Sequence, residues 1–520
     1  MISSLVGLSF ITARHEDVKT AHELHQFAID FAIDIVRVEL LLKLDWTGLD
    51  QGLDNQPPIS VTAFSALSPH TWPFSLEWLP RTAYLVGGSV RDGLLGRHSD
   101  YLDLDFVLPT GVVETARTIA RHYQAGFVLL DAERQIARVV FPQGTVDFAQ
   151  QVGDSLEADL HRRDFTVNAI AYNPHTAEFI DPLNGCIDLE KRLIRMVSAE
   201  NLQEDPLRLL RAYRQSAQLN FYLDPATATA IHQFAPLLQR IAAERIQSEL
   251  NYLLSAPGGT VWLTRAWQND LLKSWLPDAT IASFELLARM DQTVIWLQEV
   301  MPEFVVALLD RIRIPTRSGQ SHAIDIPKSS SGTKPLNVLE SGASGSARNW
   351  LMTAKFACLL PSLPITAEAQ LRSLKYSRTE IQAVSTVLKA LPQLCTAAHR
   401  TNAEATEATS GIPINLSLRE QYFLFQSVGA AFPALAVFAI AQGIALEAIS
   451  PLIQRFLVPE DPVAHPIPLL TGQDLMTTLH LPAGPQIGQL LAAVQLARAE
   501  GLINTPAEAI EFARNLLTST

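Results

Sequence analysis

The stretch LDLDFVL, Leu102–Leu108, constrains the fold of this chain more than any other part of its sequence. Alternation of apolar and acidic residues is typical of a β-strand, because successive side chains point to opposite faces of a sheet. Asp103 and Asp105 are therefore expected to project together, with Leu104 and Phe106 on the other face. Like charges held this close repel each other, and a bound divalent cation would remove the conflict. The sequence thus predicts a strand that carries two metal ligands.

The residues around this strand predict a small mixed α/β module that begins near Thr82. AYLVGG is an apolar run ending in glycines, and FVLLD, ARVVFP and GTVDFA are typical of further strands separated by turns. Beyond about Lys191, Leu and Ala recur at three- and four-residue spacing and strand patterns nearly vanish. The predicted fold class is α+β, with a small mixed β-sheet head followed by an all-helical neck, body and tail.

These changes of pattern predict the domain boundaries. Residues 1–81 form an N-terminal extension of unknown function with a helix at Ala21–Leu44, 82–190 the head, 191–255 the neck, 256–460 the body and 461–520 the tail. The body contains a Ser-, Gly- and Pro-rich insert at 314–349, and a second polar break is predicted from Thr396 to Pro413.

Composition and charge exclude several classes of protein. A formal charge of −13 argues against indiscriminate binding to nucleic acid. The three cysteines form no CxxC pair, so neither a disulfide framework nor a thiolate zinc site is expected, and a reducing, cytoplasmic setting fits best. Tyr422–Leu446 is uncharged over a length that could cross a bilayer, but Pro433 and several polar residues interrupt it. We expect a buried helix pair there and no membrane partner.

The sequence near the acid pair favours phosphoryl transfer. Oxygen ligands without His or Cys favour Mg²⁺, which takes one or two carboxylates together with waters and substrate phosphates. Gly87 and Gly88 lead from a strand into a predicted helix, where backbone N–H groups can hold a phosphate, and Arg91 follows one turn later. Taken singly, a DxD pair is usually a solvated strand edge and a Gly-Gly pair usually a tight turn. Their order along the chain is the more specific signal.

This order, GG, RD and DxD on strand, helix and strand, resembles the nucleotidyltransferase superfamily, and specifically the class II tRNA nucleotidyltransferases (CCA-adding enzymes) and the bacterial poly(A) polymerases. The resemblance covers Thr82–Leu250 strongly and the tail, Leu469–Ala513, moderately. It implies a nucleotidyltransferase head in which Asp103 and Asp105 are catalytic and hold Mg²⁺. Asp147, in GTVDFA, is a candidate third carboxylate.

The next motif is LHRRDFTVNAIAYN, Leu160–Asn173, which is similar to the family's RRDFTxNA motif. The resemblance implies that it recognises the triphosphate and ribose of the incoming nucleotide through Arg162, Arg163, Asp164 and Asn168, with Arg163 as the nucleotide-contacting arginine. On residue types alone, paired arginines before a strand are more often a surface ion-pair cluster. Their position after the acidic strand favours the nucleotide site.

EDPLRLLRAYR, residues 204–214, predicts a helix that Asp205 caps and Pro206 begins. Arginines at every third position, Arg208, Arg211 and Arg214, share one broad face of it. In the resembled family this motif is a protein template for the base, which implies that Asp205 and Arg208 read the base while Arg211 and Arg214 contact phosphate. A solvated basic helix face is the alternative.

AERIQSEL, Ala243–Leu250, resembles the neck motif that follows the template helix. The resemblance implies that Glu244 and Arg245 hold that helix in place.

The activity implied is Mg²⁺-dependent addition of CMP, and of the terminal AMP, to the 3′ end of tRNA, with the tRNA acceptor arm, CTP and ATP as partners. Only Phe148–His161 separates the GTVDFA strand from the RRD motif, a region where members that add all three nucleotides have a longer flexible loop. Family members that add only the two cytidines have such a shortened loop, so CC addition alone and full CCA addition both remain open. Poly(A) polymerase and a catalytically inactive RNA-binding protein are further alternatives. The presence of both Asp103 and Asp105 disfavours the inactive protein.

Overall fold

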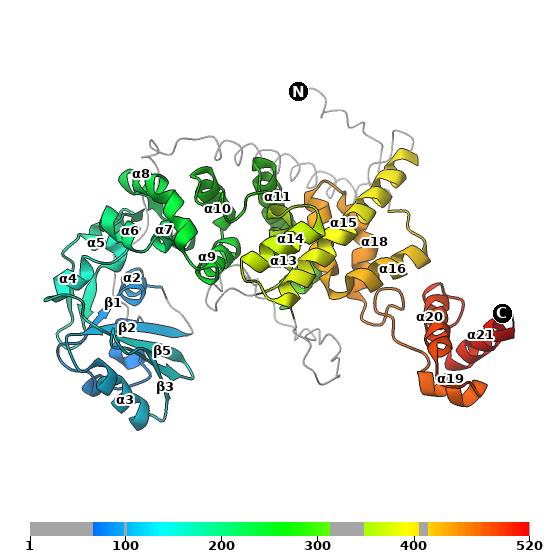
Figure 1. The fold of residues 1–520 in the computed structure, drawn as a ribbon, viewed down its shortest axis with the longest axis horizontal. Helices are drawn as coiled ribbons and strands as arrows, with labels where there is room; N and C mark the ends of the chain where they lie inside the picture. Colours follow the sequence, from blue (N-terminus) through cyan, green and yellow to red (C-terminus); the bar gives the residue numbers. More distant parts are fainter. Residues whose placement is uncertain (1–65, 98–100, 313–347, 405–413, 519–520) are drawn as a thin grey trace, which may run out of the picture. The chain divides into compact units, whose positions relative to one another are not determined.

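The computed structural model describes residues 66–97, 101–312, 348–404 and 414–518 (Figure 1). The predicted helix Ala21–Leu44 lies outside these ranges, as does the 314–349 insert except for its last two residues, Arg348 and Asn349.

A seven-stranded mixed sheet with strand order β3-β4-β5-β2-β1-β6-β7 forms the head. Its strands are β1 (Tyr84–Val86), β2 (Leu102–Leu108), β3 (Gly126–Asp131), β4 (Ile136–Phe141), β5 (Gly144–Gln150), β6 (Ala171–Asn173) and β7 (Glu178–Ile180). β2 pairs antiparallel with β1 and parallel with β5, so the acid-bearing strand occupies the centre of the sheet. The strands predicted from AYLVGG, LDLDFVL, FVLLD, ARVVFP and GTVDFA are confirmed.

One face of this sheet is covered by an aromatic core. Phe106 is fully buried, and its ring centroid lies 5.2 Å from that of Trp72 and 5.6 Å from that of Phe148. Trp72 and Phe74 belong to the chain before Thr82, next to the short 3-10 helices η2 (Pro69–Thr71) and η3 (Leu76–Trp78). The core of the head therefore includes residues that precede the boundary expected at Thr82.

Short helices connect the strands of the head, and a small parallel pair of strands opens the neck. The head helices are α2 (Gly88–Leu94), α3 (Val112–His122), α4 (Leu156–Leu160), η4 (Thr166–Asn168) and α5 (Gly185–Glu190). The neck contains β8 (Leu193–Ile194), α6 (Ala199–Glu204), α7 (Leu207–Leu219), β9 (Tyr222–Leu223), α8 (Pro225–Phe234), η5 (Ala235–Arg240) and α9 (Ala243–Ser255). Helix α7 begins at Leu207, one residue later than expected, although the Asp205 carboxylate still accepts the Leu207 N–H at 3.3 Å.

The described body and tail are helical. The body comprises α10 (Gly259–Gln268), α11 (Ile281–Val300), α12 (Pro302–Leu309), α13 (Trp350–Leu359), α14 (Pro364–Ser373), α15 (Arg378–Glu404), α16 (Leu418–Val428), η6 (Gly429–Ala431), α17 (Phe432–Ala441) and α18 (Leu446–Leu457). The tail has its own apolar core, formed by α19 (Gly472–Leu479), α20 (Pro485–Ala499) and α21 (Pro506–Thr518). The polar break was predicted to start at Thr396, and this start is wrong. Helix α15 continues through TAAHRTNAE to Glu404, a segment whose alanines favour the helix.

The uncharged segment is a pair of packed helices. By length and composition, one helix of the described chain, Leu418–Ala441, could cross a membrane, and one bent pair of helices, α13 with α14, could do so as a broken span. However, 72% of the apolar window in Leu418–Ala441 is buried inside the protein. Within it, α17 packs against α11, α13 and α15. This confirms the predicted helix pair, but the break falls at Gly429, whose φ of 54° interrupts the helix, and Pro433 lies in the first turn of α17.

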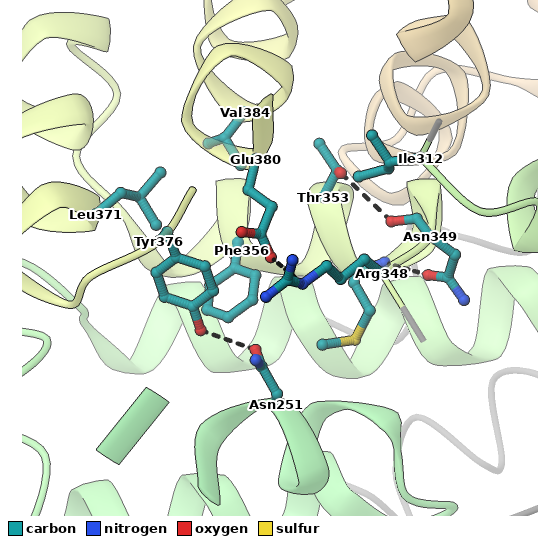
Figure 2. A pocket seen from close by; sticks show the side chains of 11 residues that line it. Asn251, Ile312, Arg348, Asn349, Thr353, Phe356, Leu371, Tyr376, Glu380 and Val384 are labelled. Atoms are coloured by element: carbon teal, nitrogen blue, oxygen red, sulfur yellow. Dashed lines mark hydrogen bonds and ion pairs between the residues drawn. The ribbon is translucent and has the colours of Figure 1, made fainter. Parts of the chain in front are cut away.

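Body helices and helix α9 of the neck line a small pocket, where the two described ends flanking 313–347 meet (Figure 2). The Ile312 N–H donates to the Arg348 carbonyl at 2.9 Å, and the Arg348 guanidinium lies 3.1 Å from the Glu380 carboxylate. Across the pocket, the Tyr376 hydroxyl donates to Asn251 at 2.8 Å. Asn349 accepts the Met352 N–H and so caps α13, which is the preferred role of Asn at a helix start.

Replacing Phe74 by Ala tests whether the segment before Thr82 is part of the head. Phe74 is 3% exposed and packs against four aromatic rings, so truncation should destabilise the head by about 3–5 kcal/mol through lost burial and a cavity. Urea denaturation measures the change. Ile365→Ala, at a position 78% exposed, is the control and should change stability by less than about 0.5 kcal/mol. Equal stability of F74A and the wild type would exclude the segment from the core.

Candidate active site

The acid pair lies on the face of β2 opposite Leu104 and Phe106, and the burial of those two residues confirms the predicted alternation. Asp103 is exposed and accepts a hydrogen bond of 2.7 Å from the Thr145 hydroxyl of β5. Asp105 is half-buried and stands in register with Asp147 of β5. Three carboxylates therefore occupy adjacent positions at the centre of the sheet.

The electrostatics of Asp105 indicate that burial and the neighbouring acids outweigh the positive charges on this face. Burial, followed by the negative charges of Asp103 and Asp147, raises the pKa of Asp105 to about 7, although Arg163 and Arg138 act in the opposite direction. A bound cation would reverse this shift, because it favours the ionised form of each carboxylate. The oxygen-only donor set of Asp103 and Asp105 fits a hard divalent ion.

Asp147 differs from the other two acids because both of its oxygens already have a partner. Arg138 Nε donates to Oδ1 at 2.6 Å and Nη2 to Oδ2 at 2.7 Å. In the part of the chain that the structure describes, no three Asp, Glu, His or Cys side chains are arranged to hold a metal ion. An ion on Asp103 and Asp105 must therefore complete its coordination with waters and substrate oxygens, as Mg²⁺ commonly does.

Gly87 brings Arg163 close to the acid pair. Its φ of +75° favours glycine, and an added Cβ would lie 3.3 Å from Arg163 Nη1 and 3.5 Å from Asp105 Oδ2. Gly88, the first residue of α2, lies in the same way beside the guanidinium of Arg91. Bare backbone at the two glycines thus leaves room for two guanidinium groups, and the one at Gly87, Arg163, also lies near Asp105.

Arg163 retains several unused donors. Its Nη2 lies 3.2 Å from Asp159 and its Nη1 makes only a long 3.5 Å contact with the Asn168 carbonyl, while Nε has no partner among the described residues. A guanidinium with spare donors is suited to an anionic ligand such as a phosphate.

Asp164 and Asn168 form a buried network that joins the head to the neck. Burial alone would raise the pKa of Asp164, but Arg211 of α7, the Asn168 amide and the Phe165 N–H hold it below its usual value. The Arg211 guanidinium lies 3.0 Å from the carboxylate. Asn168 Oδ1 accepts a 2.7 Å hydrogen bond from Arg91. The predicted residues Arg91, Asp164, Asn168 and Arg211 are therefore brought together.

Gln215 belongs to this network and was not anticipated from the sequence. It is 3% exposed, its Oε1 accepts from the Asn168 amide at 2.9 Å, and its Nε2 donates to Asp164 at 3.4 Å. The available signal was its place one helical turn after Arg211 on the same helix face.

Arg162 and Arg214 have partners elsewhere. Arg162 forms an exposed ion pair of 2.7 Å with Glu204. Arg214 lies 2.6 Å from the buried Glu249 of α9, with its guanidinium over the Tyr252 ring. The predicted phosphate contact of Arg214 thus competes with a buried ion pair that fastens α7 to α9.

Asp205 and Arg208 lie at the start of α7. Arg245 of α9 donates to both oxygens of Asp205, at 3.1 and 2.8 Å, which agrees with the supporting role expected for Arg245. Burial would raise the pKa of Asp205, but Arg245 outweighs this effect and lowers it, so Asp205 stays an ionised acceptor. Arg208 Nη1 donates to the Asn201 carbonyl at 3.0 Å.

A mixed sheet with acids on its central strand β2, glycines between β1 and α2, and an arginine-bearing neck helix is the arrangement expected of a nucleotidyltransferase. Family profiles agree: the poly(A) polymerase head domain matches residues 83–152 and 145–195, the family described as "Probable RNA and SrmB-binding site of polymerase A" matches 220–282, and domain 2 of the tRNA nucleotidyltransferases matches 348–513. The chain belongs to the tRNA nucleotidyltransferase family, whose members generally use a divalent metal ion.

Curated relatives align over most of their length. A CC-adding tRNA nucleotidyltransferase of Synechocystis sp. is 42% identical over 85% of this chain and 96% of its own. A CC-adding tRNA nucleotidyltransferase of Geobacter sulfurreducens is 30% identical over 84% of this chain and 93% of its own. An A-adding tRNA nucleotidyltransferase of Deinococcus radiodurans is 31% identical over 85% of this chain and 97% of its own.

Solved structures share the fold. The Thermotoga maritima CCA-adding enzyme in complex with tRNA aligns with a TM-score of 0.56 at 20% identity, over 84% of this chain and 91% of that one. A CCA-adding enzyme with ATP aligns with a TM-score of 0.59 at 19% identity, over 84% and 90%.

The raised pKa of Asp105 predicts that, in the absence of divalent metal, the wild type and a variant with an uncharged residue at this position differ in stability. In the folded protein the Asp105 carboxyl keeps its proton up to about pH 7, whereas in the unfolded chain it loses the proton near pH 3.8. Asp105 therefore destabilises the fold increasingly as the pH rises from 4 to 7. In EDTA at pH 8, Asp105→Asn should be more stable than the wild type by a few kcal/mol, and the gap should shrink towards pH 4. Thermal denaturation measures it, with exposed Glu114→Gln as the control. An equal melting temperature at pH 8 would contradict this electrostatic account.

Proposed function

We propose that this chain is a CC-adding tRNA nucleotidyltransferase, which adds two CMP units to the 3′ end of tRNA and stops before the terminal AMP. The observation that carries the proposal is the short connection between β5 and α4. β5 ends at Gln150 and α4 begins at Leu156, so only residues 151–155 join them. In the resembled CCA-adding enzymes a longer flexible loop in this region helps the site to change from CTP to ATP.

The connection is also held in place, which a switching loop would not be. The Val152 N–H donates to Asp159 at 3.0 Å, and the Ser155 side chain accepts the Ala158 N–H at 3.1 Å. Gly153 has a φ of +86° and packs against α4 so closely that an added Cβ would lie 2.9 Å from the Ala158 Cβ. The similarity to CC-adding relatives in two bacteria supports the same conclusion.

The metal in this proposal is Mg²⁺ held by Asp103 and Asp105, with Asp147 as a supporting acid. When bound, it would lower the pKa of the tRNA 3′-hydroxyl and neutralise the triphosphate. In-line attack by the hydroxyl on the α-phosphate would break the bond to the β-phosphate and release pyrophosphate. Around it, Arg163 and Arg91 with the backbone N–H groups of Gly87 and Gly88 would bind the phosphates. These donors would fix the nucleotide so that the hydroxyl meets the α-phosphate.

Base selection is assigned to the start of α7. Ionised Asp205 can accept from the exocyclic amine of cytosine, and the Arg208 guanidinium can donate to the adjacent ring nitrogen and carbonyl. Arg211 and Asp164, with Asn168, would hold α7 against the head so that this edge stays in register with the phosphate donors. The tRNA acceptor arm is the proposed partner, bound by shape and backbone charge in the cytoplasm.

Product analysis tests the proposal directly. Purified protein with Mg²⁺, CTP, ATP and a tRNA that lacks CCA should extend it by two cytidines, and a tRNA that already ends in CC should not change. Sequencing gels resolve these lengths. A third nucleotide would establish full CCA addition, long adenosine tails on unrelated RNA would establish a poly(A) polymerase, and a lack of any extension would exclude nucleotidyl transfer to tRNA.

Replacing Asp103 by Ala tests the acid pair. Loss of one metal ligand should lower the rate of CTP incorporation by on the order of 1,000-fold, while the affinity for tRNA stays within about twofold, because the RNA is bound elsewhere. Single-turnover incorporation and filter binding measure the two quantities, and Glu114→Gln is the charge-matched control. Retained incorporation by D103A would mean that the metal site is misplaced.

A further inference from the structure

Asp159 of α4 is a buried acid that none of the motifs above includes. It is 9% exposed and has two polar partners. One oxygen accepts the Val152 N–H of the β5–α4 connection at 3.0 Å, and the other lies 3.2 Å from Arg163 Nη2. The Asp159 carboxylate therefore joins two parts of the site. One is the β5–α4 connection, whose shortness is proposed to stop the reaction after two cytidines, and the other is Arg163, which is proposed to bind the nucleotide.

The position of Arg163 makes this link consequential. Arg163 stands over the bare backbone of Gly87, next to Asp105 Oδ2, and its positive charge already lowers the pKa of Asp105. Two acids, Asp159 and Asp105, therefore compete for one guanidinium. Without the ion pair to Asp159, the attraction that remains would draw Arg163 towards Asp105, the carboxylate that is needed for the metal.

We infer that Asp159 is a positioning residue: it holds the Arg163 guanidinium near the acid pair but prevents it from pairing with Asp105. It also couples the orientation of Arg163 to the β5–α4 connection. Asp159 uses its two oxygens for two tasks: Oδ1 anchors the backbone at Val152, and Oδ2 holds Nη2 of Arg163, which leaves Nη1 available to the incoming nucleotide. This inference rests on the proposed function, because it gives Arg163 its role in binding CTP.

Asp159→Asn separates the two tasks. An amide oxygen can still accept the Val152 N–H, but the charge that holds Arg163 is lost. We expect KM for CTP to rise about tenfold while kcat falls by less than about threefold, and the product should still end after two cytidines. A purely structural role would instead lower the active fraction, and hence the apparent kcat, with KM unchanged. That result, or wild-type values of both constants, would overturn the inference.

A double-mutant cycle tests whether Asp159 acts through Arg163. In an Arg163→Ala background, D159N should cause no further rise in KM, whereas an equal rise in both backgrounds would contradict the inference. Glu157→Gln, an exposed acid on the same helix, is the matched control and should match the wild type. If D159N does not fold, Asp159→Glu replaces it. This variant keeps the charge but displaces the carboxylate by one methylene, and it should raise KM about threefold; an unchanged KM would overturn the inference.

Wild-type activity separates the two possible failures. If the wild type does not extend tRNA, the proposed function is wrong. If the wild type is active and D159N has an unchanged KM, only the role of Asp159 is wrong.

Discussion

Mutual repulsion of carboxylates at the centre of the head sheet is the constraint on which the rest of the site depends. Asp105 stands beside Asp103 on its own strand and in register with Asp147 on the next, and its pKa rises accordingly. Such a cluster is tolerated where cations surround it. Arg138 occupies Asp147, and Arg163 approaches Asp105 across Gly87. The proposed metal would bind the other two positions, Asp103 and Asp105.

A second constraint joins recognition to catalysis across the boundary between head and neck. Asp164 is buried, and the arginine that keeps it ionised, Arg211, belongs to the helix whose first turn carries Asp205 and Arg208. Removing one partner from a buried pair leaves an uncompensated charge, so the two elements are energetically coupled. The first turn of α7, which is proposed to read the base, and the face of the head that is proposed to bind the phosphates are therefore joined in one site.

The sequence predicted the strands and the main clusters because alternation and helical spacing are local signals. The β2 alternation located both acids, and the spacing of arginines in α7 located Arg211. Asp159 and Gln215 were missed because their roles depend on contacts between segments far apart in the chain, and one buried polar residue has no local pattern. Arg214 shows the converse, since the family resemblance implied a phosphate contact, whereas in the structure its guanidinium pairs with the buried Glu249.

The most direct test of the central claim is a crystal structure of the protein with Mg²⁺, CTP and a tRNA whose terminal ribose lacks its 3′-hydroxyl. The account predicts a metal on Asp103 and Asp105 that also contacts the triphosphate, with the cytosine edge within hydrogen-bond distance of Asp205 and Arg208. A triphosphate bound without either acid, or a cytosine held away from the first turn of α7, would contradict it.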